Sequence, residues 1–189
     1  MGIERNIVYF STPGPENTDD VLRIAKTRAE ELGIKNIVVA STTGDTAVKA
    51  TEAFRGARVV VVSHSAGFKE PNTQEFSEEN KQKVESNGAV VLTATHAFSG
   101  LSRAMRKKFN MHLFEEVVAM TLYVFGRGMK VACEIAIMAA DAGLVRTDED
   151  VIAIGGTHRG ADTALVLRPV TSQDFFDLRV KEILCKPHF

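Results

Sequence analysis

The sequence predicts a single α/β domain of three layers, with helices on both faces of a mostly parallel sheet and one antiparallel strand near the C-terminus. Short apolar runs alternate along the chain with helical patterns, which is typical of strand–helix units. Two late runs are separated only by a glycine-rich loop, so one of them must run against the others. The 189 residues contain no Pro-, Gly- or Ser-rich linker, so residues 1–189 are interpreted as one domain.

Apolar runs rich in β-branched residues mark the expected strands. They cover residues 6–10, 36–40, 58–62, 89–92, 151–154 and 163–167, and a short helical turn followed by a final edge strand is expected within residues 175–185. The run at residues 36–40 is continuous rather than alternating, as in a strand that is covered on both faces.

Capping and stop signals place the helices between these strands. Thr18 is the expected N-cap of the first helix, and Gly33 is its expected end. Ser77 and Ser99 are expected to cap two later helices. We expect five helices from these signals. They run from the Thr18 cap to Leu32, from the loop at residues 41–46 to Arg55, over residues 78–86, from the Ser99 cap to Phe109, and over residues 111–142 with a break at residues 126–128.

Composition and charge exclude several classes of protein. Lys plus Arg number 23 and Asp plus Glu number 24, and without a basic stripe nucleic-acid binding is not expected. The longest apolar stretch, residues 117–125, is about half a membrane span, and the first ten residues are too short for a signal peptide, so we expect a cytoplasmic protein with no membrane partner. Cys133 and Cys185 lack ligand or CxxC spacing and are interpreted as reduced thiols.

Ser, Thr, Gly and His residues follow the expected strands, where open parallel sheets collect their ligands. No Asp or Glu comes immediately after a strand, and hydroxyls, glycine amides and an arginine without carboxylates suit an anion. The candidate binding residues are Ser11, Thr12, Ser41, Thr42, Thr43, Gly44, Thr46, His64, Thr95, His96, Gly156, Thr157, Arg159 and Gly160.

The segment STTGDTA at residues 41–47 is the strongest of these sites. A strand ends, a loop of small residues turns and a helix begins, so free backbone N–H groups would favour a phosphate there. It is not a P-loop, because GxxxxGK[ST] is absent. The alternative is that Thr43 is only an N-cap and the other hydroxyls satisfy a buried turn.

The segment GGTHRGADT at residues 155–163 is the second site. Its two leading glycines allow close backbone approach, and Arg159 can clamp a phosphate bidentately. A plain hairpin turn with an exposed arginine is the alternative. Because both segments follow strands, they should lie at the same end of the sheet.

Other chemistries find little support. His64, His96 and His158 lie on three loops without ligand spacing, so no metal site is expected. No GxSxG elbow and no GxGxxG fingerprint is present, and no catalytic residue is identified.

Residues 36–64 resemble the start of the C-terminal domain of pyruvate kinase, with the same order of strand, Ser/Thr-Gly loop, helix and strand. The motifs FSTPGPENTD, ASTTGDTA, GMKVACEIAIMAADAGL, AIGGTHRGADTALVL and VKEILCKP are similar to those of a small, stand-alone, mostly archaeal family of pyruvate kinase C-terminal-like proteins. The resemblance implies a five-strand mixed sheet whose last strand is antiparallel. It also implies phosphate binding at residues 41–46 and 155–162, and a capacity to hold flavin mononucleotide (FMN).

The two phosphate-type loops, the resemblance and the absence of an acid, base or nucleophile constellation after the strands give two hypotheses of function. The first is an FMN-binding protein, which can be an oxidoreductase. It would hold the phosphate on residues 41–46 near Arg159. The ring would lie among Ser11, Thr12, His64, Thr95, His96 and Thr157. The second is a non-catalytic sensor of a phosphorylated metabolite, and a homo-oligomer is among the open alternatives. Pyruvate kinase activity is not expected, because these residues do not include the catalytic barrel. Within the site, Thr43 and Gly44 are expected to matter more than Arg159, and Gly44→Val is expected to crowd the phosphate.

Overall fold

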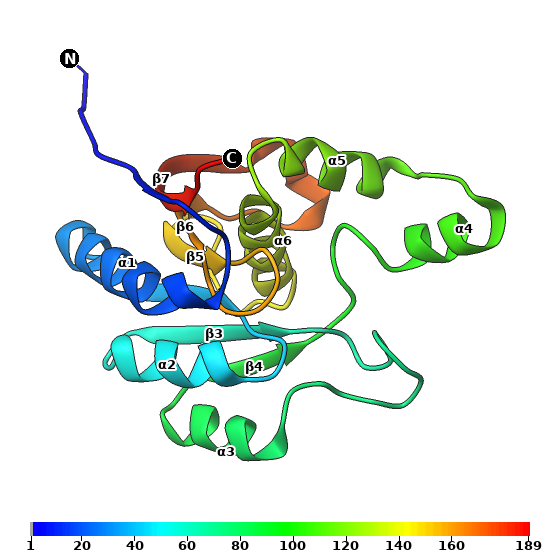
Figure 1. The fold of residues 1–189 in the computed structure, drawn as a ribbon, viewed down its shortest axis with the longest axis horizontal. Coiled ribbons are helices and arrows are strands. Elements are labelled where there is room, and N and C mark those ends of the chain that lie inside the picture. Colours follow the sequence, from blue (N-terminus) through cyan, green and yellow to red (C-terminus); the bar gives the residue numbers. More distant parts are fainter. Residues whose placement is uncertain (1) are drawn as a thin grey trace.

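A computed structural model describes residues 2–189 and contains one seven-stranded sheet with helices on both faces (Figure 1). The strand order is β1-β7-β6-β5-β2-β3-β4. The strands are β1 (Val8–Phe10), β2 (Asn36–Ala40), β3 (Arg58–Ser63), β4 (Val90–Thr93), β5 (Val151–Gly155), β6 (Thr163–Arg168) and β7 (Arg179–Pro187). Only β6 runs against its neighbours, so the α/β class and the antiparallel strand are confirmed.

Six α-helices connect the strands. They are α1 (Thr18–Leu32), α2 (Asp45–Ala53), α3 (Glu78–Ser86), α4 (Leu101–Phe109), α5 (Phe114–Tyr123) and α6 (Arg127–Asp141), with short 3-10 helices η1 (Pro15–Asn17) and η2 (Ser172–Asp177). Ser77 caps α3 as predicted, since its hydroxyl accepts the N–H of Asn80. The expected caps Thr18 and Ser99 are wrong: Thr18 is the first residue inside α1, and Gly100 precedes α4.

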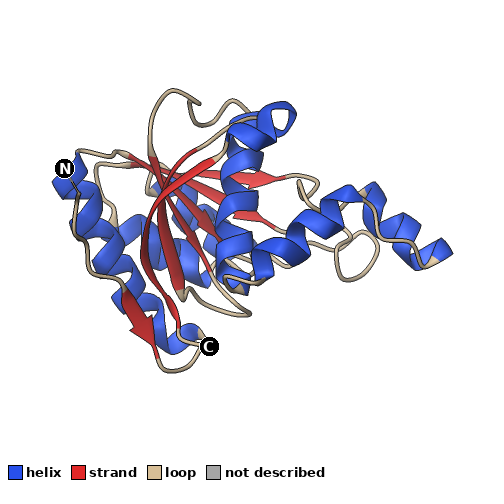
Figure 2. Cartoon of the chain, turned by 90° about the horizontal axis from the view of Figure 1, so that it is seen from above, coloured by secondary structure: helices blue, strands red, loops and turns tan. Residues whose placement is uncertain are grey.

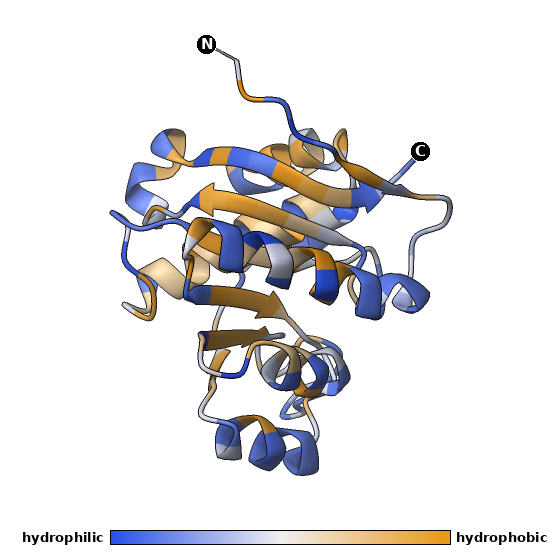
Figure 3. Cartoon of the chain, turned by 90° about the vertical axis from the view of Figure 1, so that its left-hand side faces the viewer, coloured by the Kyte–Doolittle hydropathy of each residue, from blue (hydrophilic) through white to orange (hydrophobic). Residues whose placement is uncertain are grey.

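Two hydrophobic cores lie on opposite faces of the sheet. Ile37 and Val39 of β2 point into the core that α1, α2 and α3 cover, whereas Val38 points into the core under α5 and α6. This alternation of fully buried residues explains why the sequence of β2 is continuously apolar. Figure 3 shows the same arrangement, with apolar residues on the strands and polar residues on the outer sides of the helices.

The strand order differs from the expectation at the C-terminal end. β7 is not an edge strand, because β1 pairs with it in parallel on the side away from β6. β7 therefore runs in the direction of the main sheet, and the antiparallel strand is the penultimate one rather than the last. The physical reason is that three residues of the N-terminal segment, Val8–Phe10, add the edge strand that the local pattern near the C-terminus cannot reveal.

The sheet reverses its direction of growth between β2 and β5. From β2 the chain proceeds outward through β3 to β4, then crosses back through α6 to β5 on the other side of β2. The loops after β2 and β5 consequently diverge, leaving a crevice of the kind in which α/β sheets bind ligands.

A helical arm extends from one side of the sheet. Figure 2 shows α4 and the adjoining end of α5 projecting away from the strands. Between residues 2 and 189, no helix combines the length and apolarity needed to cross a bilayer.

Candidate ligand-binding site

A cavity of about 890 Å³ lies at the carboxyl ends of β2, β3 and β5, where the sheet reverses direction. This volume is within the range used for small molecules and cofactors. Of the predicted binding residues, the cavity is lined by Ser41, Thr42, Thr43, Thr46, His64, His96, Gly156, Thr157, Arg159 and Gly160. The two segments singled out in the sequence therefore do face one common space.

Ser11 and Thr12 do not line this cavity. They follow the edge strand β1, which β7 and β6 separate from β5, and the hydroxyl of Thr12 donates to Glu16 at 3.0 Å. The first loop reaches the cavity instead through Pro15 and Thr18. The Thr18 hydroxyl accepts the N–H of Ala161 at 3.0 Å, which ties the start of α1 to the β5–β6 hairpin.

Thr95 and Gly44 also lie outside the lining. Thr95 is exposed, and its methyl group lies against Gly100. Gly44 has a φ of +101°, and a Cβ atom there would collide with Asn80 and approach Phe76 to 2.9 Å. Gly44 therefore faces α3 rather than the ligand space, so the expectation that Gly44→Val would crowd a phosphate directly is wrong.

The loop at residues 41–46 combines an internal turn with free donors. The hydroxyl of the buried Ser41 accepts the N–H groups of Gly44 and Ala47 at 3.2 and 3.3 Å, so this hydroxyl satisfies a buried turn. Gly44, not Thr43, is the N-cap of α2. Within residues 2–189, no acceptor is bonded to the N–H groups of Thr42, Thr43, Asp45 and Thr46. Unpaired amides at a helix start are anion donors.

Asp45 is the one carboxylate at this helix start. Its two oxygens accept from the Thr43 hydroxyl at 2.8 Å and from the Asn80 side chain at 3.0 Å. Asn80 also donates to the Thr43 carbonyl, so α3 holds the carboxylate and the loop together. These bonds draw the charge of Asp45 toward α3, which reduces its repulsion of an anion at the free amides.

The β5–β6 hairpin is organised by a buried carboxylate. Asp162, fully buried, accepts the N–H of Thr157 at 3.0 Å and the hydroxyl of Thr163 at 2.8 Å. The hydroxyl of Thr157 is buried without a partner, and the Arg159 side chain is exposed and forms no bond to any residue from 2 to 189. The hairpin is thus fixed by Asp162 while two of its donors remain available.

α6 contributes charged groups that the sequence patterns did not single out. Gly128 packs against Thr163, and a Cβ atom at Gly155 would come within 2.6 Å of the Gly128 carbonyl, so the first turn of α6 rests directly on the strand ends. Lys130 and Glu134 then project into the cavity wall. Their charged atoms are 2.5 Å apart, although both side chains are almost fully buried.

A recognisable signal for this pair exists in the sequence. Lys130 and Glu134 are spaced i,i+4 in a helix that is otherwise apolar around them, and such charges are seldom buried without a partner. The other oxygen of Glu134 accepts the backbone N–H of Phe98 at 3.0 Å. A second pair without a clear sequence signal joins His64 Nδ1 to Glu75 at 2.8 Å.

An aromatic cluster forms another wall of the cavity. The ring of Phe68 lies 4.1 Å from that of His64 and 5.0 Å from that of His96. The guanidinium of Arg103 covers Phe68 at 4.3 Å from the ring centre. Burial lowers the pKa of His96 to about 4, with the positive charges of Lys130 and Arg103 acting in the same direction and Glu134 opposing them. His96 is consequently neutral at pH 7.

Two buried side-chain atoms in the described part of the chain have no hydrogen-bond partner, and both belong to this cavity. They are Arg103 Nε and the Thr157 hydroxyl oxygen. Buried polar groups are normally paired, so unpaired ones mark a place where a partner from outside the chain fits.

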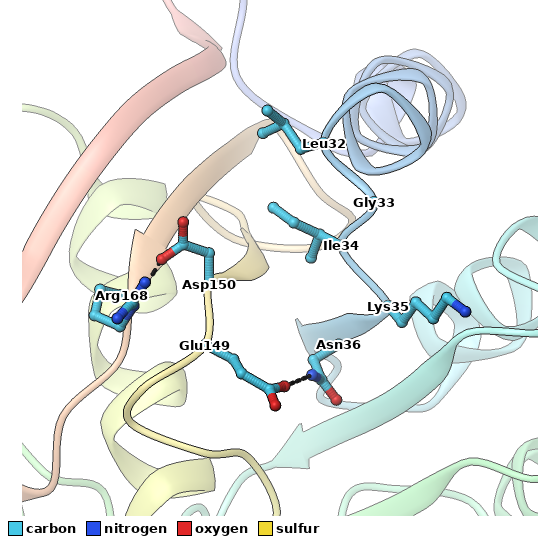
Figure 4. A pocket seen from close by; sticks show the side chains of 8 residues that line it. All are labelled: Leu32, Gly33, Ile34, Lys35, Asn36, Glu149, Asp150 and Arg168. Carbon is cyan, nitrogen blue, oxygen red and sulfur yellow. Dashed lines mark hydrogen bonds and ion pairs between the residues drawn. The ribbon is translucent and has the colours of Figure 1, made fainter.

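A smaller cavity, of about 390 Å³, lies at the opposite end of the sheet (Figure 4). Its polar groups pair with one another: Arg168 donates to Asp150 at 2.7 Å, and Asn36 donates to Glu149 at 3.0 Å. Since these groups are satisfied and the cavity lies at the start of β2 and β5, we do not assign a ligand to it.

Metal and thiol chemistry receive no support from the geometry. Residues 2–189 contain no group of three His, Cys, Asp or Glu side chains placed to hold a metal ion. Cys133 and Cys185 are free and buried, and burial raises the pKa of each thiol to about 12, so neither is a reactive thiolate.

Comparison with known proteins identifies the family. A sequence profile described as the α/β domain of pyruvate kinase matches residues 19–167. The chain belongs to the pyruvate kinase α/β domain family. The match includes both the loop at residues 41–46 and the β5–β6 hairpin, so the two anion-type segments are parts of the family domain.

Two solved structures are similar to this pyruvate kinase α/β domain at low identity. One is a pyruvate kinase from Cryptosporidium parvum, with 12% identity and a TM-score of 0.42 over 81% of this chain and 23% of that one. The other is the Cryptosporidium parvum pyruvate kinase in complex with ADP, with 13% identity and a TM-score of 0.42 over 84% and 25% of the two chains. The domain therefore spans about a quarter of the length of these enzymes.

Substitution of Gly44 should damage the fold. Gly44→Ala places a side chain at positive φ and displaces Asn80, so the free energy of unfolding should fall by about 2–4 kcal/mol. Gly33→Ala is the matched control, because its φ of +68° is also positive but no atom lies within 4 Å of the new Cβ. That control should lose only about 1–2 kcal/mol in urea unfolding. Equal losses in the two variants would contradict the close contact with Asn80.

His96 should make stability depend on pH. Between pH 6.5 and 4 the unfolded chain binds a proton at His96 that the folded chain does not, so the free energy of unfolding falls as the pH falls through this window. Because the ring is only partly buried, we expect a contribution of about 1–2 kcal/mol. Urea unfolding of wild type and His96→Asn at pH 7 and pH 4 measures it. Identical pH dependence in the two proteins would show that His96 titrates normally.

Proposed function

We propose that this pyruvate kinase α/β domain binds a phosphate-bearing small molecule, most specifically FMN, in the 890 Å³ cavity. The observation that carries the proposal is the convergence of unpaired donors on one space. Four backbone N–H groups at the start of α2 and two buried side-chain atoms lack acceptors, and all belong to the loops and helices around this cavity. A phosphate supplies the acceptors that these donors lack.

The charge of the lining supports an anionic ligand. Six cationic side chains line the cavity against three carboxylates, an excess of three positive charges. Each carboxylate already has a partner: Asp45 binds Thr43 and Asn80, Glu75 binds His64, and Glu134 binds Lys130. We place the phosphate on residues 42–46 with Arg159 beside it.

The aromatic wall suits a flat ring system. His64, Phe68 and His96 form a continuous cluster, and Thr157 has a free buried hydroxyl on the hairpin side. The ring placement expected from the sequence also included Ser11, Thr12 and Thr95, but those three lie outside the cavity and are left out of the proposed ring site. Bound FMN would supply hydride or single-electron transfer, while the chain contributes position and charge.

A sensor without catalysis is the second candidate. Two of the three carboxylates of the cavity wall are held in ion pairs, His64–Glu75 and Lys130–Glu134, which favours binding over proton transfer by these groups. Thermal-shift measurements with FMN, sugar phosphates and nucleotides distinguish the two candidates. Stabilisation by FMN together with turnover of an electron donor favours the oxidoreductase, and stabilisation by a sugar phosphate alone favours the sensor.

Titration with FMN tests the placement of the phosphate. Arg159→Ala should weaken binding by about 1–2 kcal/mol, or roughly 5- to 30-fold, because the guanidinium is exposed and contributes one part of the phosphate contact. Arg146→Ala is the control, since Arg146 is also an exposed arginine and does not line the cavity. Quenching of flavin fluorescence measures both affinities. A wild-type protein that neither quenches nor shifts this fluorescence excludes FMN.

A further inference from the structure

The end of the cavity nearest α4 carries an arginine without a counter-ion. The Arg103 side chain lines the cavity and stacks on Phe68, yet it forms no hydrogen bond or ion pair with residues 2–189, and its Nε atom is buried. The two oxygens of Glu134, another group of the cavity wall, each already accept a hydrogen bond, one from Lys130 and one from the N–H of Phe98. A buried guanidinium donor with no acceptor is costly, so this end of the cavity favours an anion from outside the chain.

This positive end differs from the phosphate loop. Arg103 belongs to α4, whereas the free amides belong to the start of α2, and Figure 1 shows α2 and α4 on opposite sides of the molecule. His96, which lines the same cavity beside Phe68, is neutral at pH 7 and adds no charge there. The cavity therefore has two separate regions that attract anions.

We propose that Arg103 forms a second subsite that binds a carboxylate or phosphate group beside the FMN of the proposed function. The proposal rests on that function only in sharing its cavity. A bidentate contact with the planar guanidinium, whose carbon lies 4.3 Å from the centre of the Phe68 ring, would satisfy the buried Nε atom. The ligand class is a small anion that binds beside the FMN, such as an organic acid or inorganic phosphate.

Calorimetric titration of malonate and of inorganic phosphate into FMN-loaded and FMN-free protein tests the subsite. Arg103→Gln should weaken binding of the probe at least tenfold, and Arg103→Lys should weaken it less because the charge remains. Lys107→Gln removes the same charge from an exposed position of α4 outside the cavity, and it should bind the probe as wild type does. Preference for malonate over phosphate identifies a carboxylate ligand.

Three results separate the subsite from the proposed function. Probe binding that depends on Arg103 in a protein that does not bind FMN supports the subsite and overturns the FMN proposal. Equal probe affinity in wild type and Arg103→Gln, or no binding of either probe, overturns the subsite. If Arg159→Ala loses probe binding and Arg103→Gln keeps it, the probe binds on the phosphate loop, and this result also overturns the subsite.

An independent observation concerns α5, which is apolar around most of its circumference. Val118 and Leu122 pack toward α6, while Val117 and Met120 are about half exposed and Val124, just after the helix, is 78% exposed. The polar groups on the exposed side of α5 are Thr121 and the hydroxyl of Tyr123. An apolar helix face is normally buried, so the exposed apolar face of α5 lacks a contact surface in the single chain.

The exposed patch extends beyond α5. Phe114 lies 6.0 Å from Phe176, which is 78% exposed, and Phe175 links Phe176 to the buried Phe98. Together the exposed side chains present on the order of 500 Å² of apolar surface, if an aromatic side chain contributes up to about 200 Å². That is large for a monomer and more than half of the about 800 Å² that each partner gives to a standard interface.

The patch is held in a fixed shape. Arg106 donates to Glu116 at 2.6 Å and Ser102 donates to Glu115 at 2.7 Å, so α4 is fastened to α5. A surface that is already ordered loses little conformational entropy when it binds.

We infer that the α5 patch is the interface between two copies of this chain. Its outward stripe, Phe114, Val117, Met120 and Val124, carries no charge, so it can face its own copy about a two-fold axis without repulsion. α5 has no Lys or Arg, the residues that an interfacial membrane helix uses to contact phospholipid. An association of two copies therefore fits the patch better than a lipid surface does.

Sedimentation equilibrium at micromolar concentrations tests this interface. Wild type should be a dimer or higher oligomer, and Val117→Glu should raise its dissociation constant at least tenfold by placing two charges face to face. Leu32→Glu is the control, because Leu32 is similarly exposed at the far end of α1, and it should associate as wild type does. A monomeric wild type overturns the inference, as does an oligomer unaffected by Val117→Glu. Monomers that co-sediment with phosphatidylglycerol vesicles would assign the patch to a membrane instead.

Discussion

The contact between the first turn of α6 and the ends of β5 and β6 determines the shape of the cavity. Gly128 and Gly155 let the helix backbone approach the sheet more closely than any side chain would allow. Because Arg127 begins the helix at this point, Lys130 and Glu134 fall beside the loops rather than over the middle of the sheet. A larger residue at either glycine would lift the helix and carry its charged groups away from the anion-type loops.

The close approach of α6 to the strand ends also explains how the charged side chains of Lys130 and Glu134 come to be buried in an otherwise apolar helix layer. The alanine-rich remainder of α6 packs on β2 and β5 with almost no exposed surface, so the Lys130–Glu134 pair meets solvent only on the side that faces the cavity. Removing one partner from such a pair is far more damaging than replacing both, because it leaves a buried charge uncompensated. The bond from Glu134 to the N–H of Phe98 also fixes the segment after β4, which holds His96 in the cavity wall.

Membership of the pyruvate kinase α/β domain family accounts for the fold of this protein but not for its chemistry. The family match ends at residue 167, whereas β7 and its pairing with β1 lie outside the matched residues. These strands complete the sheet on the side away from the cavity, so the matched part contains the crevice except for Pro15 and Thr18, and the remainder stabilises its edge. The function must consequently be established at the cavity, by measurements on this chain.

The sequence by itself determined the features that depend on neighbours along the chain. The helix over residues 78–86 with its Ser77 cap, the hairpin of β5 and β6, and the two anion-type segments at one sheet end follow from local periodicity, capping and the rule for parallel strands. Only the tertiary structure decided the features that join distant residues. The pairing of β1 with β7 and the bond from Glu134 to Phe98 depend on how the layers pack. The orientation of Gly44 is also tertiary: a Cβ atom added there would point at Asn80 of α3, and no local pattern specifies which surface a loop residue will meet.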